Sequence, residues 1–299
     1  MPSASTALSR ALERMEGILF RPFDAGKWFV LGFSAFLASL GEGGSFNPGG
    51  IGNHGGAPAE IQSWVQDHMA FVIALAVGIL VFALALGILF AWLSSRGAFM
   101  FLDNVLHDRA EVREPWRRFR AQGNRLFVFT LVAGLACIGA FLLLVLAGAV
   151  VLVPMLKDGW HFAALLPILL FAALFVVLLL AVLLFWAFLR DFGVPLMARQ
   201  GLSPMEALGC LRREVLPGHA WDFTRFYLLK FVLALGAGLL VLAAGCLTCC
   251  IGFLPYLSAV LTLPVSVFFR CYSLEFLAQV DPRWDFFPAP PSESAPAQP

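Results

Sequence analysis

The sequence predicts an all-α protein: a polytopic transmembrane helical bundle of six spans, with helices at the cytoplasmic membrane surface between them. Two observations predict this class. Of the 299 residues, 60% are hydrophobic and only 13% are charged, whereas a soluble domain needs far more polar surface. The hydrophobic residues also form uninterrupted runs close to the roughly 20 residues that cross a bilayer as a helix. The chain is therefore expected in a membrane.

Six apolar runs define the predicted spans. The first is short, and Pro255 and Pro264 interrupt the last, although a packed membrane bundle tolerates proline. The spans lie at Trp28–Leu40, Met69–Leu93, Phe127–Val153, Phe162–Leu189, Phe226–Cys250 and Phe253–Phe269. Residues 27–276 then form the six-span membrane domain, between an N-terminal interfacial helix at 1–26 and a cytoplasmic tail at 277–299. The tail is rich in proline and is expected to be disordered at its end.

The distribution of Lys and Arg orients these spans, because short loops that carry these residues stay on the cytoplasmic side. Residues 94–126 contain seven arginines, and the N-terminal segment, residues 190–225 and the tail are also basic. The opposite side of the membrane receives Lys157 alone. Both termini are therefore expected in the cytoplasm.

Each cytoplasmic segment contains a sequence typical of a helix lying at a membrane surface. In the clearest one, Ser203 precedes Pro204 at the first helical position and Glu206 completes a capping box, while Pro217 and Gly218 end the helix. Apolar residues recur at helical spacing there and in two other segments. These residues are Met205, Leu208, Leu211 and Val215; Leu8, Leu12, Met15 and Leu19; and Val112, Trp116 and Phe119.

A candidate internal repeat appears at an offset of 94 residues. The matched pairs are Trp92 with Trp186, Arg96 with Arg190, Arg118 with Arg212, Phe129 with Phe223, and Thr130 with Thr224. The repeated unit would be a span, a cytoplasmic segment and a second span, so its two copies would be parallel, related by an axis along the membrane normal. Arg270, which follows the sixth span, suggests that the chain ends supply a third copy.

The candidate binding residues are arginines of the cytoplasmic segments, which could contact the headgroups of anionic lipids. Retention of positive charge in the cytoplasm explains the same residues without a ligand, and nucleic acid is not an expected partner. The predicted lipid contacts are Arg113, Arg117, Arg118, Arg120, Arg212 and Arg213.

The sequence predicts no catalytic, cofactor or metal site. Cys246, Cys249 and Cys250 lack a fourth ligand nearby, so packing at a tight turn is the simpler interpretation. The acidic and His residues in or beside the Gly-rich loop match no ligand motif; they are Glu42, His54, Glu60, Asp67 and His68. An enzyme would require polar groups to converge at one interface, for which the candidates are His107, Asp108, Asp191 and His219.

Charged residues inside spans usually mark ion or proton pathways. The centres of the second, third and fourth spans contain none, and Lys230 lies near enough to a span end to snorkel. This argues against a carboxylate-driven transporter. A passive permeation path could still use the weakly polar stripe Ser258, Thr262 and Ser266, although small hydroxyl residues more often serve helix packing.

The segment Asp191–Ala207, DFGVPLMARQGLSPMEA, resembles a pattern of six-span prokaryotic membrane proteins. That group includes the membrane domain of glycerophosphodiester phosphodiesterases and related uncharacterised stand-alone families. The matching residues are Val194, Pro195, Leu196, Ser203, Glu206 and Ala207. The resemblance implies a multi-pass protein of the prokaryotic cytoplasmic (inner) membrane. It does not imply phosphodiesterase activity, because the catalytic domain is not in this sequence.

We expect a non-enzymatic membrane scaffold or lipid-associated component whose partners are membrane lipids and either another membrane protein or a second copy of the chain. The alternative is a transporter or permeation path for a lipidic or small solute. Both interpretations follow from the spans and from the lack of recognisable catalytic motifs.

The six-span topology predicts the side of the membrane on which each loop lies. Cysteine labelling or reporter fusions at Gly50, Lys157 and Gly252 should report the extracytoplasmic side, and those at Arg118 and Arg213 the cytoplasm. Reversal at Gly50 alone would make the first apolar run a re-entrant element.

Overall fold

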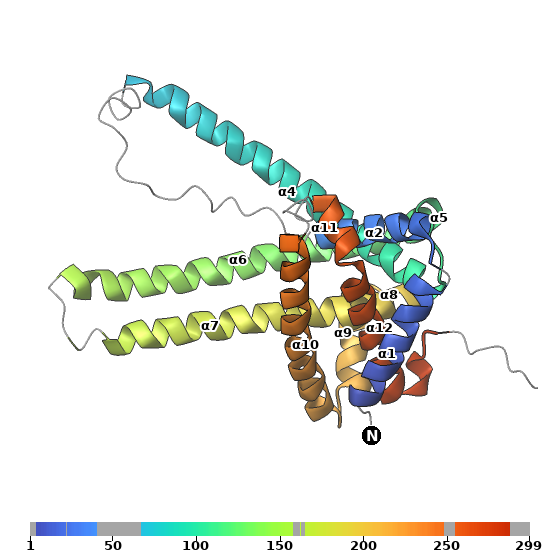
Figure 1. Ribbon diagram of the computed structural model, residues 1–299. Helices are drawn as coiled ribbons and strands as arrows, with labels where there is room; N and C mark the ends of the chain where they lie inside the picture. The colour runs from blue at the N-terminus through green and yellow to red at the C-terminus, as the bar shows by residue number, and fades with distance from the viewer. Residues whose placement is uncertain are drawn as a thin grey trace, which may run out of the picture.

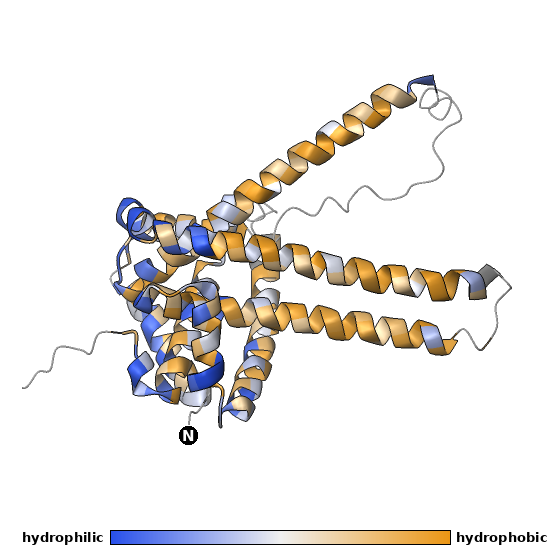
Figure 2. Ribbon diagram, turned by 180° about the vertical axis from the view of Figure 1, so that it is seen from behind, coloured by the Kyte–Doolittle hydropathy of each residue, from blue (hydrophilic) through white to orange (hydrophobic). Residues whose placement is uncertain are grey.

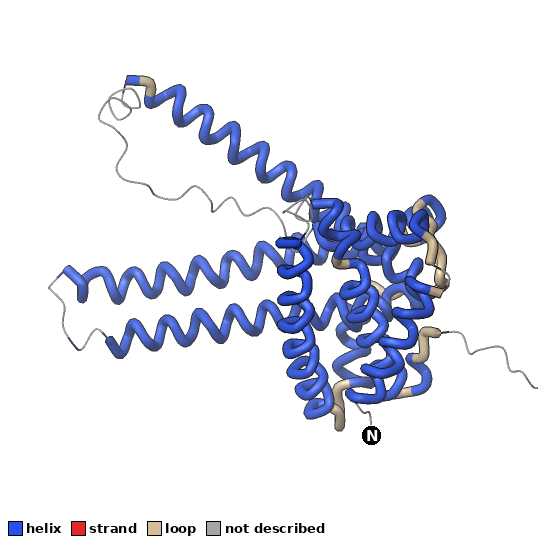
Figure 3. The backbone as a smooth tube through the Cα atoms, viewed as in Figure 1, coloured by secondary structure: helices blue, strands red, loops and turns tan. Residues whose placement is uncertain are grey.

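The computed structural model describes residues 4–21, 23–40, 67–157, 162, 165–247 and 255–287. In this part of the chain the secondary structure is helical and contains no strand, which confirms the all-α class (Figure 3). The α-helices are α1 (Ala4–Phe20), α2 (Ala25–Ser39), α4 (Met69–Leu106), α5 (Arg113–Arg118), α6 (Arg120–Lys157), α7 (Leu165–Phe188), α8 (Val194–Gln200), α9 (Pro204–Cys210), α10 (Ala220–Leu247), α11 (Pro255–Leu261) and α12 (Leu263–Val280). Shorter turns are the π-helical η4 (Leu189–Gly193) and η5 (Leu211–Val215) and the 3-10 turn η7 (Pro282–Trp284).

Four helical segments are long and apolar enough to cross a membrane: Met69–Leu106, Arg120–Met155, Leu165–Gln200 and Ala220–Ala243. Their most apolar stretches are almost entirely uncovered by protein. Figure 2 shows α4, α6 and α7 as hydrophobic arms that leave a smaller, mixed body. Lipid tails cover such surfaces as well as protein does, so these helices have the character of membrane spans.

The long helices do not all lie side by side as one bundle. α6 and α7 lie side by side, α4 splays away from them, and α10 runs across their direction (Figure 1). Apolar helices gain no hydrophobic drive to associate in lipid, so their outer lengths have little reason to pack together. The first and last predicted spans correspond to α2, which has only 15 residues, and to α11 with α12, which break at Thr262. Six crossings stay a prediction.

Two long helices continue past the ends predicted from hydropathy. α4 extends from the predicted end at Leu93 to Leu106, and α7 passes through the π turn into α8, which ends at Gln200. The added lengths are mostly buried and include polar side chains: Ser94, Ser95, Arg96, Asp103, Asn104 and Asp191. Hydropathy marks where an apolar surface stops, whereas these helices continue because protein covers them.

The body is built around one end of the long helices. α2 packs on α4, α11 packs on α2, and α1 packs along α12 (Figure 1). An aromatic cluster of Phe192, Phe223, Phe226, Tyr272 and Phe276 joins η4, α10 and α12. Phe226 and Tyr272 stack with ring centroids 4.7 Å apart. Such pairs stabilise a core beyond their buried area, so this cluster fixes the three elements relative to one another.

The N-terminal helix and the start of the tail belong to this body. Ala7, Ala11 and Leu19 of α1 are buried, and Arg14 is ion-paired with Glu275 of α12, a side chain only 3% exposed. The apolar stripe of α1 therefore contacts protein, and a position at the membrane surface stays a prediction. α12 continues beyond the predicted boundary at 276, and Trp284 is buried. Residues 288–299 lie outside the described residues.

The capping box predicted at Ser203 is confirmed. The Ser203 hydroxyl accepts from the Glu206 backbone N–H, and the Glu206 carboxylate accepts from the Ser203 backbone N–H at 2.8 Å. The hydrogen bond from the Ser203 backbone N–H, with a further one from the Ser203 side chain, lowers the pKa of Glu206 because both favour the charged carboxylate. Gly218 follows the helix with φ 82°, a conformation that glycine adopts at no steric cost.

The contact between α2 and α4 depends on a glycine. A Cβ at Gly97 would lie 2.6 Å from the backbones of Leu37 and Ala38, whereas a Cβ at Gly87 would meet nothing within 4 Å. Gly97→Ala is expected to destabilise the protein by about 1–3 kcal/mol through overpacking. Gly87→Ala, the control on the same helix, is expected to be neutral or stabilising. Thermal unfolding in detergent measures both, and equal midpoints would contradict the close contact.

Candidate functional site

The predicted lipid-contacting arginines occupy two different segments. Arg113, Arg117 and Arg118 line one shallow hollow formed by α5 and residues 110–112, together with Glu111 and Glu114, and Arg120 follows at the start of α6. Arg212 and Arg213 are exposed on η5, beyond α9. The structure thus brings the α5 arginines together and places the other pair on a separate element.

Asp103 holds the α5 segment against α4. Its side chain is 2% exposed, accepts a 2.8 Å hydrogen bond from Arg109, and lies 3.6 Å from the Arg118 guanidinium. The hydrogen bond to Asp103 raises the pKa of Arg109. On the neighbouring loop, a hydrogen bond with Glu114 raises the pKa of Glu111. A buried carboxylate with these partners fixes the loop through Arg109 and the end of α5 through Arg118.

A second group of charges lines a cavity of about 350 Å³ between α2, α4, α7, η4, α10 and α12. Its charged residues are Arg190, Asp191, Lys230 and Arg270, so three cations face one carboxylate. We call this space the cationic cavity. Its remaining walls are small, weakly polar or aromatic: Ala35, Ala38, Ser39, Phe101, Ala187, Ala234, Ser266 and Phe269.

The aromatic cluster positions the charged residues of the cavity. Asp191 directly precedes Phe192, Lys230 lies one helical turn after Phe226, and Arg270 comes two residues before Tyr272. Because these aromatic side chains are fully buried, the backbone that carries each charge is fixed. The buried aromatic residues therefore bring Asp191, Lys230 and Arg270, which are distant in the sequence, to one place.

Specific contacts hold the charges in the cationic cavity. Lys230 Nζ lies 2.5 Å from Asp191 Oδ2 and 5.7 Å from the centre of the Phe269 ring. Arg270 donates a 2.8 Å hydrogen bond to the backbone carbonyl of Arg190, and its guanidinium lies 5.9 Å from the Phe101 ring centre. By formal charge, the four residues carry an excess of two positive charges.

Sequence reasoning missed this cavity. Lys230 was placed near enough to a span end to snorkel, but its pairing with Asp191 was not foreseen. The recurrence of Arg96, Arg190 and Arg270 after apolar runs was the available signal. It identified span ends but gave no indication that two of these arginines meet.

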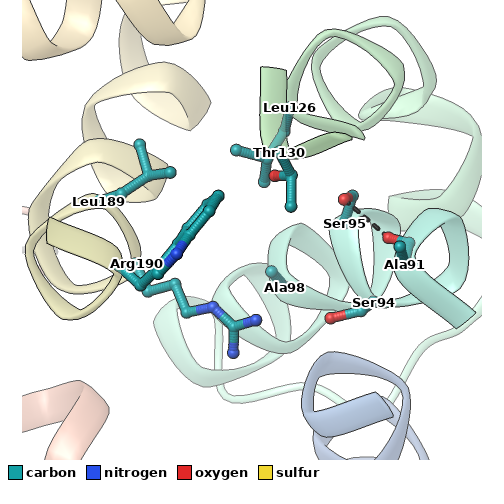
Figure 4. A pocket seen from close by; sticks show the side chains of 9 residues that line it. Ala91, Ser94, Ser95, Ala98, Leu126, Thr130, Leu189 and Arg190 are labelled. Carbon is teal, nitrogen blue, oxygen red and sulfur yellow. Dashed lines mark hydrogen bonds between the residues drawn. The ribbon is translucent and has the colours of Figure 1, made fainter. Parts of the chain in front are cut away.

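A narrow cleft of about 50 Å³ adjoins the cationic cavity and shares Arg190 with it. Figure 4 shows the Arg190 side chain extending from its helix towards Ser94 and Ala98 of α4. The Ser95 hydroxyl donates to the carbonyl of Ala91 at 2.8 Å, so it is engaged within its own helix. Arg190 therefore lies between the two spaces.

The polar residues considered for an enzyme do not converge. His107 contacts Asp103, Asp108 pairs with Lys27, Asp191 pairs with Lys230, and His219 contacts Asp222. Each of the four thus has a different partner.

The structure describes only some residues of the cysteine cluster and of the Gly-rich loop, and all three residues of the hydroxyl stripe. Among the described residues, no three or more His, Cys, Asp or Glu side chains form a group that could hold a metal ion. Cys249, Cys250, Glu42, His54 and Glu60 lie outside those residues. In the hydroxyl stripe, Thr262 donates to the carbonyl of Ser258 and Ser266 to that of Thr262, and Ser266 also lines the cationic cavity.

Comparison with known proteins gives one match. Residues 2–255 match the model of a family described as a family of unknown function (DUF7544). No curated protein and no solved structure matches the chain. These findings do not link the chain to the membrane domain of glycerophosphodiester phosphodiesterases, so the resemblance of Asp191–Ala207 stays a prediction.

The Asp103 contacts predict how α5 responds to a substitution. Asp103→Asn removes the charge that holds Arg109 and Arg118, and amide hydrogen exchange across residues 109–118 should accelerate about tenfold or more. Asp108→Asn is the control, because Asp108 is exposed and contacts Lys27 of α2 instead. Unchanged exchange in Asp103→Asn would show that α5 is held by other contacts.

Proposed function

This chain belongs to a family of unknown function, DUF7544, and we propose that it is a six-span protein of the prokaryotic cytoplasmic membrane that binds anionic lipids. One observation carries the proposal. The first part of α4 is apolar and not covered by protein, and its last part, from Ser94 to Val105, is buried. The exposed arginines of α5 follow just after this buried part. Uncovered apolar surface next to cationic surface matches the boundary between lipid tails and anionic headgroups.

The six-span topology rests on α2 and on α11 with α12 as the outer pair of crossings. These short helices support each other: the Tyr256 hydroxyl donates to the carbonyl of Phe29 at 3.0 Å, and Gly32 lies against Val260. A span of 15 residues is shorter than the bilayer core, and a thinned membrane accommodates it at modest cost. Because α10 runs across α6 and α7, its crossing has the least support, and the reporter at Gly252 tests it.

Placement of both termini in the cytoplasm has structural support. α1 packs along α12, and η7 follows α12 directly, so the two described ends of the chain lie in one body. The arginines of α5 belong to the same body, and positive charge favours the cytoplasmic side. We propose the cytoplasmic membrane of a prokaryote from this charge distribution together with the resemblance of Asp191–Ala207.

The proposed activity is binding of lipid by a non-enzymatic membrane component. A permeation path for a lipidic or small solute is the second candidate. It is favoured by the cationic cavity and the adjoining cleft, which meet at Arg190 between α4 and α7. A continuous conduit would admit a membrane-impermeant anion into sealed proteoliposomes, whereas a binding protein would not.

The α5 arginines predict selective retention of anionic lipid. After mild extraction, phosphatidylglycerol and cardiolipin should be enriched over phosphatidylethanolamine relative to the whole membrane, measured by mass spectrometry. Arg113→Gln with Arg117→Gln should reduce the enrichment about fivefold or more, because each surface arginine contributes roughly 1 kcal/mol to such binding. Arg113→Lys with Arg117→Lys, which keeps the charge, should retain it. Equal enrichment in all three proteins would refute the proposal.

A further inference from the structure

The cationic cavity has an imbalance of charge that its own residues do not remove. Three cations, Arg190, Lys230 and Arg270, share the space with a single carboxylate, Asp191. The side chains of Lys230 and Asp191 are only 21% and 12% exposed, so water screens them poorly. Partly buried positive charge in excess is unfavourable unless an anion compensates it. The cavity is therefore suited to a negatively charged ligand.

The walls of the cavity indicate that this ligand also has an apolar part. Ala187 and Ala234 lie on the walls contributed by α7 and α10, and both helices continue away from the cavity with uncovered apolar side chains. Arg190 lies at the inner end of α7, where that helix joins the body, and Lys230 lies within α10 beside it. An anionic group in the cavity with hydrocarbon along the uncovered side of α7 has the form of a membrane lipid. The volume of about 350 Å³ is enough for a headgroup and within the range of small-molecule sites.

We propose that the cationic cavity binds the phosphate headgroup of one anionic membrane lipid, with Lys230 and Arg270 as its principal cationic contacts. This site is distinct from the α5 surface, and it rests on the proposed function only for the presence of the chain in a membrane. Lysine and arginine are the side chains that recognise phosphate, and basic pockets between membrane helices are suited to lipid headgroups.

Asp191 has a specific role in this proposal. Its carboxylate lies 2.5 Å from Lys230, in the position that a phosphate oxygen would take on the same ammonium group. Asp191 is thus an internal anion that competes with the ligand for Lys230. Its presence keeps the empty cavity stable, and it lowers the affinity for the headgroup.

The test is a titration of full-length, delipidated protein in detergent, followed by native mass spectrometry. The probes are phosphatidylglycerol, zwitterionic phosphatidylcholine and inorganic phosphate. Lys230→Gln lowers the net charge of the cavity by one, Asp191→Asn raises it by one, and the double variant restores the original value. Arg270 is left unchanged because it also holds the Arg190 backbone. Lys27→Gln is the matched control, since Lys27 is a similarly paired lysine outside the cavity, 2.6 Å from Asp108.

The proposal predicts one tightly held phosphatidylglycerol and an affinity order set by cavity charge. Relative to the original protein, affinity should fall about fivefold in Lys230→Gln and rise about fivefold in Asp191→Asn. It should be nearly unchanged in the double variant and in Lys27→Gln. The double variant keeps the net charge of the cavity but loses the ion pair. Its affinity therefore shows whether the changes in the single variants come from charge or from damage to the fold. Thermal unfolding of each variant measures such damage directly.

Three results would overturn the proposal: weaker binding in Asp191→Asn, equal binding of phosphatidylcholine, or inorganic phosphate that binds as tightly and displaces the lipid. The last result would identify a free oxyanion as the ligand. Failure of the cavity proposal is distinguishable from failure of the proposed function. The proposed function is tested by anionic lipid enrichment in the α5 variants, and that enrichment does not depend on the cavity. A protein that keeps that enrichment but holds no single lipid would refute this inference alone.

Discussion

The structure depends on two helices that pass without a break from an apolar environment into a packed body. α4 and the α7–η4–α8 segment each begin with side chains that protein leaves uncovered, and each ends with side chains that protein buries. The second half of each segment buries polar residues, such as Asp103 and Asp191, inside the body. A rigid helix that spans both regions brings buried charge directly to the boundary of the lipid region.

Placement of charge at that boundary explains the two sites. On α4, Asp103 is neutralised by arginines of the following loop, and the result is a fixed, basic surface. On η4, Asp191 shares a cavity with its neighbour Arg190, with Lys230 of α10 and with Arg270 of α12, and the result is a cavity with excess positive charge. The two segments end 94 residues apart, at Leu106 and Gln200, which is the offset of the candidate repeat. The repeat itself stays a prediction, because the two charge groups have different partners.

Features that depend on local sequence could be predicted, and those that depend on distant partners could not. The capping box at Ser203 and the four long apolar helices follow from neighbouring residues, and the structure confirms both. The ends of α4 and of the continuous α7–η4–α8 segment could not be placed, because a helix covered by protein needs no apolar surface to continue. The pairing of Lys230 with Asp191 joins residues 39 positions apart, and no periodicity indicates it. The α5 arginines were predicted from charge alone, whereas the cavity required knowledge of which helices meet.

The most direct test of this account is a structure determined by cryo-electron microscopy in nanodiscs that contain phosphatidylglycerol. The account predicts density for one phosphate group in the cationic cavity, within hydrogen-bond distance of Lys230 and Arg270, continuous with an acyl chain along α7. A cavity that holds only water, or one closed by the side chains of α10, would contradict it.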